Sequence, residues 1–129
     1  MKKLNNYILE KLKKISSKNT GQTYNYFPKD KKELEQIIKD LIKERGNEAN
    51  LNDIDTSEII DMSYTFMYSK FNGDISKWDI SNVKYMNYMF YKSDFNGDIS
   101  EWNISNVKDM HFMFRHCPLE KNPPKWYKE

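Results

Sequence analysis

The sequence predicts an α/β repeat fold, in which strand–helix units of 24 residues stack behind an N-terminal capping helix. Three observations support this prediction. A segment in the second half of the chain recurs almost unchanged, and its apolar residues follow the spacing of a short strand and a short helix. The stretch 30–45, which precedes the repeats, is strongly amphipathic. A chain of 129 residues is the length of one ordinary domain.

The repeat occupies residues 71–94 and returns in residues 95–118. Both copies begin Phe-Asn-Gly-Asp-Ile-Ser, and 15 of the 24 aligned positions are identical. In the same register, residues 51–59 align with residues 75–83. Trp126 lies 24 residues after Trp102. Residues 51–129 therefore hold roughly three and a half units. The period lies within the range of leucine-rich repeats, about 20–29 residues.

The first half of each unit predicts a short strand. Ile75, Trp78 and Ile80 have the L-x-x-L-x-L spacing, in which alternate side chains point inward. The next unit repeats this spacing with Ile99, Trp102 and Ile104. We expect Trp78 and Trp102 to stack one above the other in the core, because they occupy equivalent positions.

The second half of each unit predicts a short helix and a turn. Val83, Met86 and Phe90 follow at i, i+3 and i+7, which is one face of a helix. Ser81 is placed to be its N-cap, as Ser105 is in the next unit. The Asn-Gly dipeptides at 72–73 and 96–97 are typical of turns. Each unit is then strand, helix and turn, and the fold is a short leucine-rich-repeat-like solenoid.

The repeats resemble those of a known family. Residues 28–129 are similar to the BspA-like leucine-rich-repeat proteins, whose units read much like Phe-Asn-Gly-Asp-Ile-Ser-Lys-Trp-Asp-Ile-Ser-Asn-Val. That resemblance implies a bacterial surface-protein type of repeat that binds other proteins, with no catalytic residue among the shared positions. The chain has few repeats for this family, and no export signal is recognised.

The predicted solenoid, together with its C-terminal cap, spans residues 47–129. Two further segments, 1–20 and 21–46, precede it. Residues 21–46 form a predicted N-terminal cap, with 22–27 as a candidate strand and a helix over 30–45. Asp30 and Glu33 fit a capping box, and Gly46 is placed to end the helix. The helix carries an apolar stripe of Leu34, Ile37, Ile38, Leu41 and Ile42. We expect this stripe to cover the open end of the first repeat.

Residues 1–20 are a basic amphipathic segment. Within 1–18, six lysines stand against one glutamate. The segment is interpreted either as a helix packed on the domain or as an anchor for an anionic membrane or nucleic acid, and we favour packing. Neither a signal peptide nor a spanning segment is recognised, which predicts a cytoplasmic protein. The single Cys117 excludes a disulfide within the chain.

Composition and motifs provide little evidence for chemistry. The net charge of +2 is too small for a general polyanion binder, so no direct nucleic-acid binding is expected. His111, His116 and Cys117 form the best reactive cluster, but they occupy variable repeat positions. Asp74 and Asp98 suggest either a calcium ladder or ordinary turn chemistry. We therefore predict no enzyme activity, no catalytic or metal-binding residue and no cofactor.

The variable repeat positions are the candidate binding residues. On the predicted strands, the outward positions are polar and mildly acidic, and begin with Asn52. On the helical side, tyrosines gather beside Tyr64 and Tyr68 and form a candidate aromatic patch. The predicted partner-binding residues are Asp53, Asp55, Lys77, Asp79, Glu101, Asn103, Tyr85, Tyr88 and Tyr91.

The predicted function is that of a non-enzymatic protein-binding module that uses a small leucine-rich-repeat surface. Residues 51–129 have nine basic against twelve acidic side chains, whereas residues 1–50 have twelve against seven. A partner with a basic surface is therefore expected at the repeats. The alternative is a small inhibitor, encoded by a phage or mobile element, that blocks a host enzyme through its acidic face, such as an enzyme that handles nucleic acid.

Overall fold

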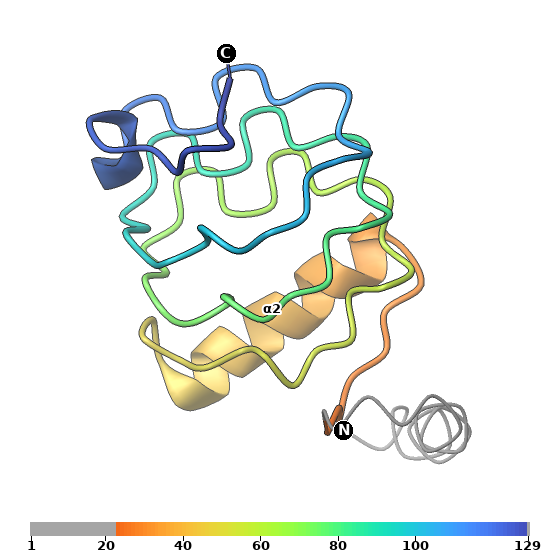
Figure 1. Ribbon diagram of the computed structural model, residues 1–129. Coiled ribbons are helices and arrows are strands. Elements are labelled where there is room, and N and C mark those ends of the chain that lie inside the picture. Colours follow the sequence, from red (N-terminus) through yellow and green to blue (C-terminus); the bar gives the residue numbers. More distant parts are fainter. Residues whose placement is uncertain (1–22, 129) are drawn as a thin grey trace.

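The computed structural model describes residues 23–128, and its longest element is the helix α2, Lys31–Arg45 (Figure 1). Asp30 is the N-cap, and its carboxylate accepts a hydrogen bond of 2.9 Å from the Glu33 amide. The Glu33 carboxylate in turn accepts from the Lys29 amide. At the other end, the Gly46 amide donates to the Ile42 carbonyl. The φ of Gly46 is 93°, a positive value that favours glycine. The helix agrees with the predicted range 30–45, and residues 1–22 lie outside the described part.

The rest of the chain corrects the predicted fold class. Apart from α2 and the short 3₁₀ helix η1, Pro118–Glu120, residues 23–128 contain isolated parallel bridges but no sheet and no further helix. The bridges join Tyr26 to Ile54, Asn50 to Asp74, Asp61 to Tyr85, and Tyr85 to Asp109. The α/β leucine-rich-repeat-like solenoid of strand–helix units is therefore wrong, and the candidate strand at 22–27 amounts to one bridge.

The predicted helix at 83–90 is instead a run of overlapping turns. The Met89 amide donates to the Met86 carbonyl and the Tyr91 amide to the Tyr88 carbonyl, which are bonds between residues three apart. Tyr88 and Lys92 have φ of 58° and 52°, values outside the α-helical region. Left-handed residues interrupt the helical backbone, and apolar spacing alone does not reveal them.

The predicted strands are turns as well. The Trp78 amide donates to the Ile75 carbonyl, and this tight turn replaces extended backbone. Ser81 is not the N-cap of a helix, because its amide and hydroxyl both donate to the Asp79 carboxylate. The same arrangement closes the preceding turn, where Ser76 donates to Asp74. The Asp-x-Ser pattern thus specifies a turn held by its own side chains.

The 24-residue period survives as a stack of these irregular turns, which lie one above another over α2 (Figure 1). Equivalent rings form continuous columns through the core. Phe90 stacks between Phe66 and Phe114 at 5.5 and 5.7 Å. Trp102 stacks between Trp78 and Trp126 at 6.5 and 6.3 Å. The expected stacking of Trp78 on Trp102 is therefore present.

Backbone hydrogen bonds join each turn to the next. The Tyr64 amide donates to the Asn87 carbonyl, and the Tyr88 amide donates to the His111 carbonyl. Gly73 lies where two turns come closest, since a Cβ there would stand 1.9 Å from the Ala49 carbonyl oxygen. This glycine is therefore required for space rather than for an unusual φ.

α2 covers one end of the stack. Four of its side chains belong to the same buried core as the repeats: Leu34, Ile37, Ile38 and Leu41. An ion pair of 3.0 Å between Arg45 and Asp53 fastens the end of the helix to the first repeat. In the part of the chain from 23 to 128, no helix is long and apolar enough to cross a membrane.

Candidate binding surface

The candidate reactive cluster does not form a site. Cys117 is buried, and this burial raises the pKa of its thiol. His111 and His116 are exposed. Among residues 23–128, no three His, Cys, Asp or Glu side chains are grouped so that they could hold a metal ion.

Asp74 and Asp98 have a local role in the turns. Each carboxylate accepts a hydroxyl and a backbone amide, from Ser76 and from Ser100 respectively. These hydrogen bonds, with the side chain of the serine as the largest cause, lower the pKa of both carboxyl groups. The geometry is that of the turn chemistry proposed for these residues as the alternative to calcium binding.

The predicted acidic residues lie on turns and are unequally accessible. Asn52 is buried rather than outward-facing. The Asp53 carboxylate accepts from the two terminal guanidinium nitrogens of Arg45 and from the Asn25 side-chain amide. Burial raises the pKa of Asp53, but these hydrogen bonds outweigh it and hold the pKa below its usual value. Asp53 is therefore occupied by contacts within the chain.

Most of the other residues predicted on this face are exposed, whereas Asp55 is half-buried like Asp53. Asp55, Asp79 and Asn103 occupy one column, and each side-chain oxygen accepts the amide two residues further on. Lys77 and Glu101 are exposed in the neighbouring column. The repeat register thus keeps these residues on one side of the stack, although no strand carries them.

A second surface is built from aromatic rings. The rings of Tyr64 and Tyr88 stack at 5.2 Å with an interplanar angle of 9°, and Phe112 continues the column at 5.4 Å. Tyr91 meets the edge of Tyr88 at 5.4 Å and of Tyr68 at 5.9 Å. Tyr68 is 62% exposed and Tyr64 is 42% exposed, so this ring cluster faces outward.

Cations border these rings. The Lys92 ammonium lies over Tyr68 and Tyr91 at 5.8 and 5.5 Å, and the Arg115 guanidinium lies over Phe112 at 5.2 Å. Such contacts hold long side chains against the rings while their charges stay accessible. We call this surface the aromatic face, with residues Tyr64, Tyr68, Tyr88, Tyr91, Phe112, Lys92 and Arg115.

The backbone beneath the aromatic face is strained in a regular way. Within residues 23–128, six residues other than glycine have positive φ, and they form two columns: Tyr64, Tyr88 and Phe112, then Tyr68, Lys92 and His116. A left-handed residue with a side chain costs about 1–2 kcal/mol. Strain of this kind often accompanies function. The sequence showed the tyrosines, and aligning the repeats would have added Phe112, but nothing in it signalled the positive φ.

Of the three tyrosines predicted to bind a partner, Tyr88 and Tyr91 belong to the aromatic face. Tyr85 lies in the adjacent column, bridged to Asp61 and Asp109, and is 42% exposed. The structure therefore separates the predicted partner-binding residues into an acidic side and an aromatic side.

Comparison with known proteins identifies the family of the chain. The family described as "Mycoplasma protein of unknown function, DUF285" matches residues 30–127. The chain belongs to the DUF285 family. The match begins at the N-cap of α2 and continues through the last stacked turn. No curated protein and no solved structure matches the chain.

Charge is segregated within the DUF285 repeats. We define the acidic arm as residues 50–58, 74–82 and 98–106, and the aromatic arm as residues 60–68, 84–92 and 108–116. The acidic arm contains seven acidic side chains and one lysine. The aromatic arm contains four lysines and arginines and two aspartates. The two arms therefore suit partners of opposite charge.

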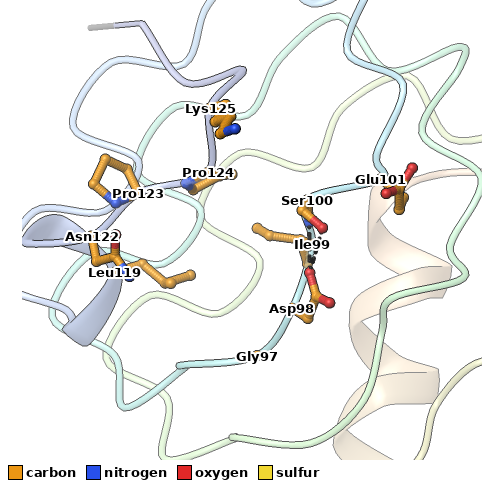
Figure 2. Close-up of a pocket in the computed structure, with 10 residues that line it drawn as sticks. All are labelled: Gly97, Asp98, Ile99, Ser100, Glu101, Leu119, Asn122, Pro123, Pro124 and Lys125. Carbon is orange, nitrogen blue, oxygen red and sulfur yellow. Dashed lines mark hydrogen bonds between the residues drawn. The ribbon is translucent and has the colours of Figure 1, made fainter.

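A pocket of about 500 Å³ lies at the last turn of this DUF285 chain (Figure 2). Figure 2 shows Leu119 and Pro123 of the C-terminal segment on one side, and Ile99 and Ser100 on the other. Its acidic groups are Asp98, which is engaged by Ser100, and Glu101. The pocket arises where the C-terminal segment crosses the last repeat, and we assign it no ligand.

The strain at Tyr88 makes a prediction about stability. Tyr88→Gly and Tyr88→Ala both remove the ring, but only alanine keeps a Cβ at positive φ. We expect the glycine variant to be more stable by about 1 kcal/mol in urea denaturation. Lys84 is exposed and its φ is not positive, so the same pair there should rank in the opposite order. Equal or greater stability of Tyr88→Ala would contradict the left-handed backbone.

Proposed function

We propose that this DUF285 chain is a non-enzymatic protein-binding module and that the aromatic face is its binding site. The observation that carries the proposal is the outward-facing cluster of tyrosines, held ring against ring on a strained backbone. Tyrosine is enriched at protein interfaces because it provides a large contact area with little entropy loss. A ring that is already fixed by its neighbours loses still less entropy on binding.

The scaffold supports the same proposal. Ring columns and hydrogen bonds between turns hold the aromatic residues in one register, so the surface is preorganised. The resemblance of the repeats to BspA-like proteins agrees with protein binding, because members of that family typically bind other proteins. Arg115 and Lys92 add charged groups at the rim, which favour specificity and fast association.

A second candidate function uses the acidic arm. Its excess of acidic side chains favours a partner with a basic surface, including the host enzyme of the inhibitor hypothesis. Asp55, Asp79 and Glu101 are its most useful test residues, because Asp53 is already paired with Arg45. The local hydrogen bonds of Asp55 and Asp79 give them a structural role as well.

The proposal is tested by removing the two most exposed rings. Asparagine tolerates positive φ, so Tyr64→Asn with Tyr68→Asn removes the rings without new strain. We expect the affinity for a partner captured from the source cell, measured by calorimetry, to fall by at least about ten-fold.

The matched control is Ile60→Ser, which removes another exposed apolar side chain of the first turn. Its affinity should be unchanged. If the tyrosine variant binds normally while Asp55→Asn, Asp79→Asn and Glu101→Gln together slow association at low salt, the acidic arm is the site instead.

A further inference from the structure

The aromatic arm crosses three successive turns of the stack, at 60–68, 84–92 and 108–116. In the first two of these turns its backbone amides follow one pattern. In the second turn, the amides of Met86, Tyr88 and Phe90 donate to carbonyls of the third turn at 2.8, 2.9 and 2.9 Å. The equivalent amides of the first turn donate to the second in the same way. Every alternate amide thus points toward the next turn in the stack.

In the described part of the chain, the third turn, at 108–116, has no following repeat that could accept hydrogen bonds from its amides. The equivalent amides belong to Met110, Phe112 and Phe114, and no residue between 23 and 128 accepts a hydrogen bond from them. The amides between them are satisfied locally, since Met113 donates to Met110 and Arg115 to Phe112. The last turn therefore ends in a row of alternate backbone donors, as an open sheet edge does.

The C-terminal segment closes the rest of this end. The Trp126 indole donates to the Ile99 carbonyl at 2.8 Å, which continues the bonds made by Trp78 and Trp102. The next amide of the series, that of His116, donates to the Glu120 carboxylate. The acidic arm and the end of the row are thus capped within the chain. Phe114 is also covered, because it is 1% exposed and its ring contacts Trp126 and Tyr127. The accessible part of the row is therefore at Met110 and Phe112, which are both half-buried.

The charge around the open row is positive. Lys108 and Arg115 are exposed at its two ends, and only Asp109 opposes them within 108–116. Lys84 and Lys92 occupy the equivalent positions one turn below. An occupant with acidic side chains would meet these cations while its carbonyls faced the amides.

A second copy of the chain is a poorer occupant. The complementary row of carbonyls would come from the first turn, but α2 is placed at that end of the stack (Figure 1). Lys31 of α2 reaches the Ser63 hydroxyl at 3.3 Å and lies over the Tyr64 ring at 5.1 Å. Stacking of copies end to end would have to displace these contacts.

We propose that an extended acidic segment of a partner protein adds to the stack at the amides of Met110 and Phe112. Its carbonyls accept these two hydrogen bonds in the manner of strand addition, and its carboxylates lie near Lys108 and Arg115. This mode rests on the proposed protein-binding function and extends the aromatic face, because Phe112 belongs to both.

The test is amide hydrogen exchange of the full chain, followed by NMR. Without ligand, the amides of Met110 and Phe112 should exchange at least about ten-fold faster than those of Met86 and Tyr88. The probe is a synthetic twelve-residue peptide in which glutamate alternates with threonine. On its addition the amides of Met110 and Phe112 should become protected, and a peptide with lysine in place of glutamate should not protect them.

Charge variants check the same model. Lys108→Gln with Arg115→Gln should weaken binding of the acidic peptide by about ten-fold and reduce its salt dependence. Lys32→Gln with Lys39→Gln, on the exposed side of α2, is the matched control and should bind normally.

Three results would overturn the inference. These are slow exchange of the Met110 and Phe112 amides without ligand, absence of acidic-peptide binding, and protection that depends on protein concentration, which would indicate a second copy. If a captured partner still depends on Tyr64 and Tyr68 but leaves these two amides unprotected, strand addition is wrong and the proposed function stands. Loss of that tyrosine dependence with protection retained would contradict the aromatic face instead.

Discussion

Trp102→Ala is expected to lower the free energy of unfolding by about 3–5 kcal/mol, the usual range for truncating a large buried aromatic residue. Trp102 is 5% exposed and stacks on a tryptophan at each side, Trp78 and Trp126. It also lies 6.4 Å from Phe90, the centre of the phenylalanine column. Its removal therefore leaves a cavity where the two main ring columns of the core meet.

The indole also makes a buried hydrogen bond. Its Nε1 donates to the Ile75 carbonyl at 3.1 Å, and an acceptor left unpaired in the core costs about 1–3 kcal/mol. Trp102→Phe keeps much of the ring but loses this donor. Its unfolding free energy should therefore lie between those of the alanine variant and the original chain, as measured by urea denaturation followed by circular dichroism.

Trp126→Ala is the matched comparison. Trp126 is the last ring of the column and is only half-buried, although its indole makes the equivalent bond to Ile99. Its loss should cost clearly less than the loss of Trp102, because a partly exposed site leaves a smaller cavity. Equal melting temperatures of Trp102→Ala and the original chain would show that the ring column is not the core.

The sequence predicted which residues occupy equivalent repeat positions more accurately than it predicted the backbone conformation. Identity across 24 residues required that equivalent residues share an environment, so the stacking of Trp78 on Trp102 could be inferred. The strand–helix unit could not be inferred safely, because residues at i, i+3 and i+7 are also buried by a chain of tight turns. Only the positive φ of residues such as Tyr88 distinguishes the two, and tyrosine rarely adopts it.

The candidate sites show a similar division. Alignment placed the variable residues on two sides of the repeat, and the structure keeps Asp79 and Tyr88 apart accordingly. It could not show that Asp53 is occupied by Arg45, since that ion pair depends on where α2 ends against the first turn. The open amides of the last turn were equally hidden, because they depend on which part of that turn the C-terminal segment covers.

Removal of α2 is expected to have the largest effect on the domain. A chain that begins after Gly46 should aggregate or remain unfolded, because it loses a helix whose apolar side chains belong to the same buried core as the first turn. The first turn contributes Leu51, Ile54, Met62 and Phe66 to that core, and all four are at most 1% exposed in the intact chain. The deletion also removes Leu34 and Leu41, which are fully buried. Exposing several large apolar side chains together costs about 1.5–3 kcal/mol for each, which exceeds the stability of many small domains.

Deletion of residues 1–22 is the control, because it leaves every described contact of α2 in place. That chain should stay monomeric in size-exclusion chromatography and melt cooperatively. A point variant separates packing from chain length: Leu41→Asp places a charge in the interface between α2 and the stack, whereas Lys39→Asp changes an exposed position of the same helix. We expect Leu41→Asp to behave like the long deletion and Lys39→Asp like the original chain. If the chain without α2 is soluble, monomeric and melts cooperatively, the helix does not seal the stack, and the first turn must be stable with its apolar surface open to water.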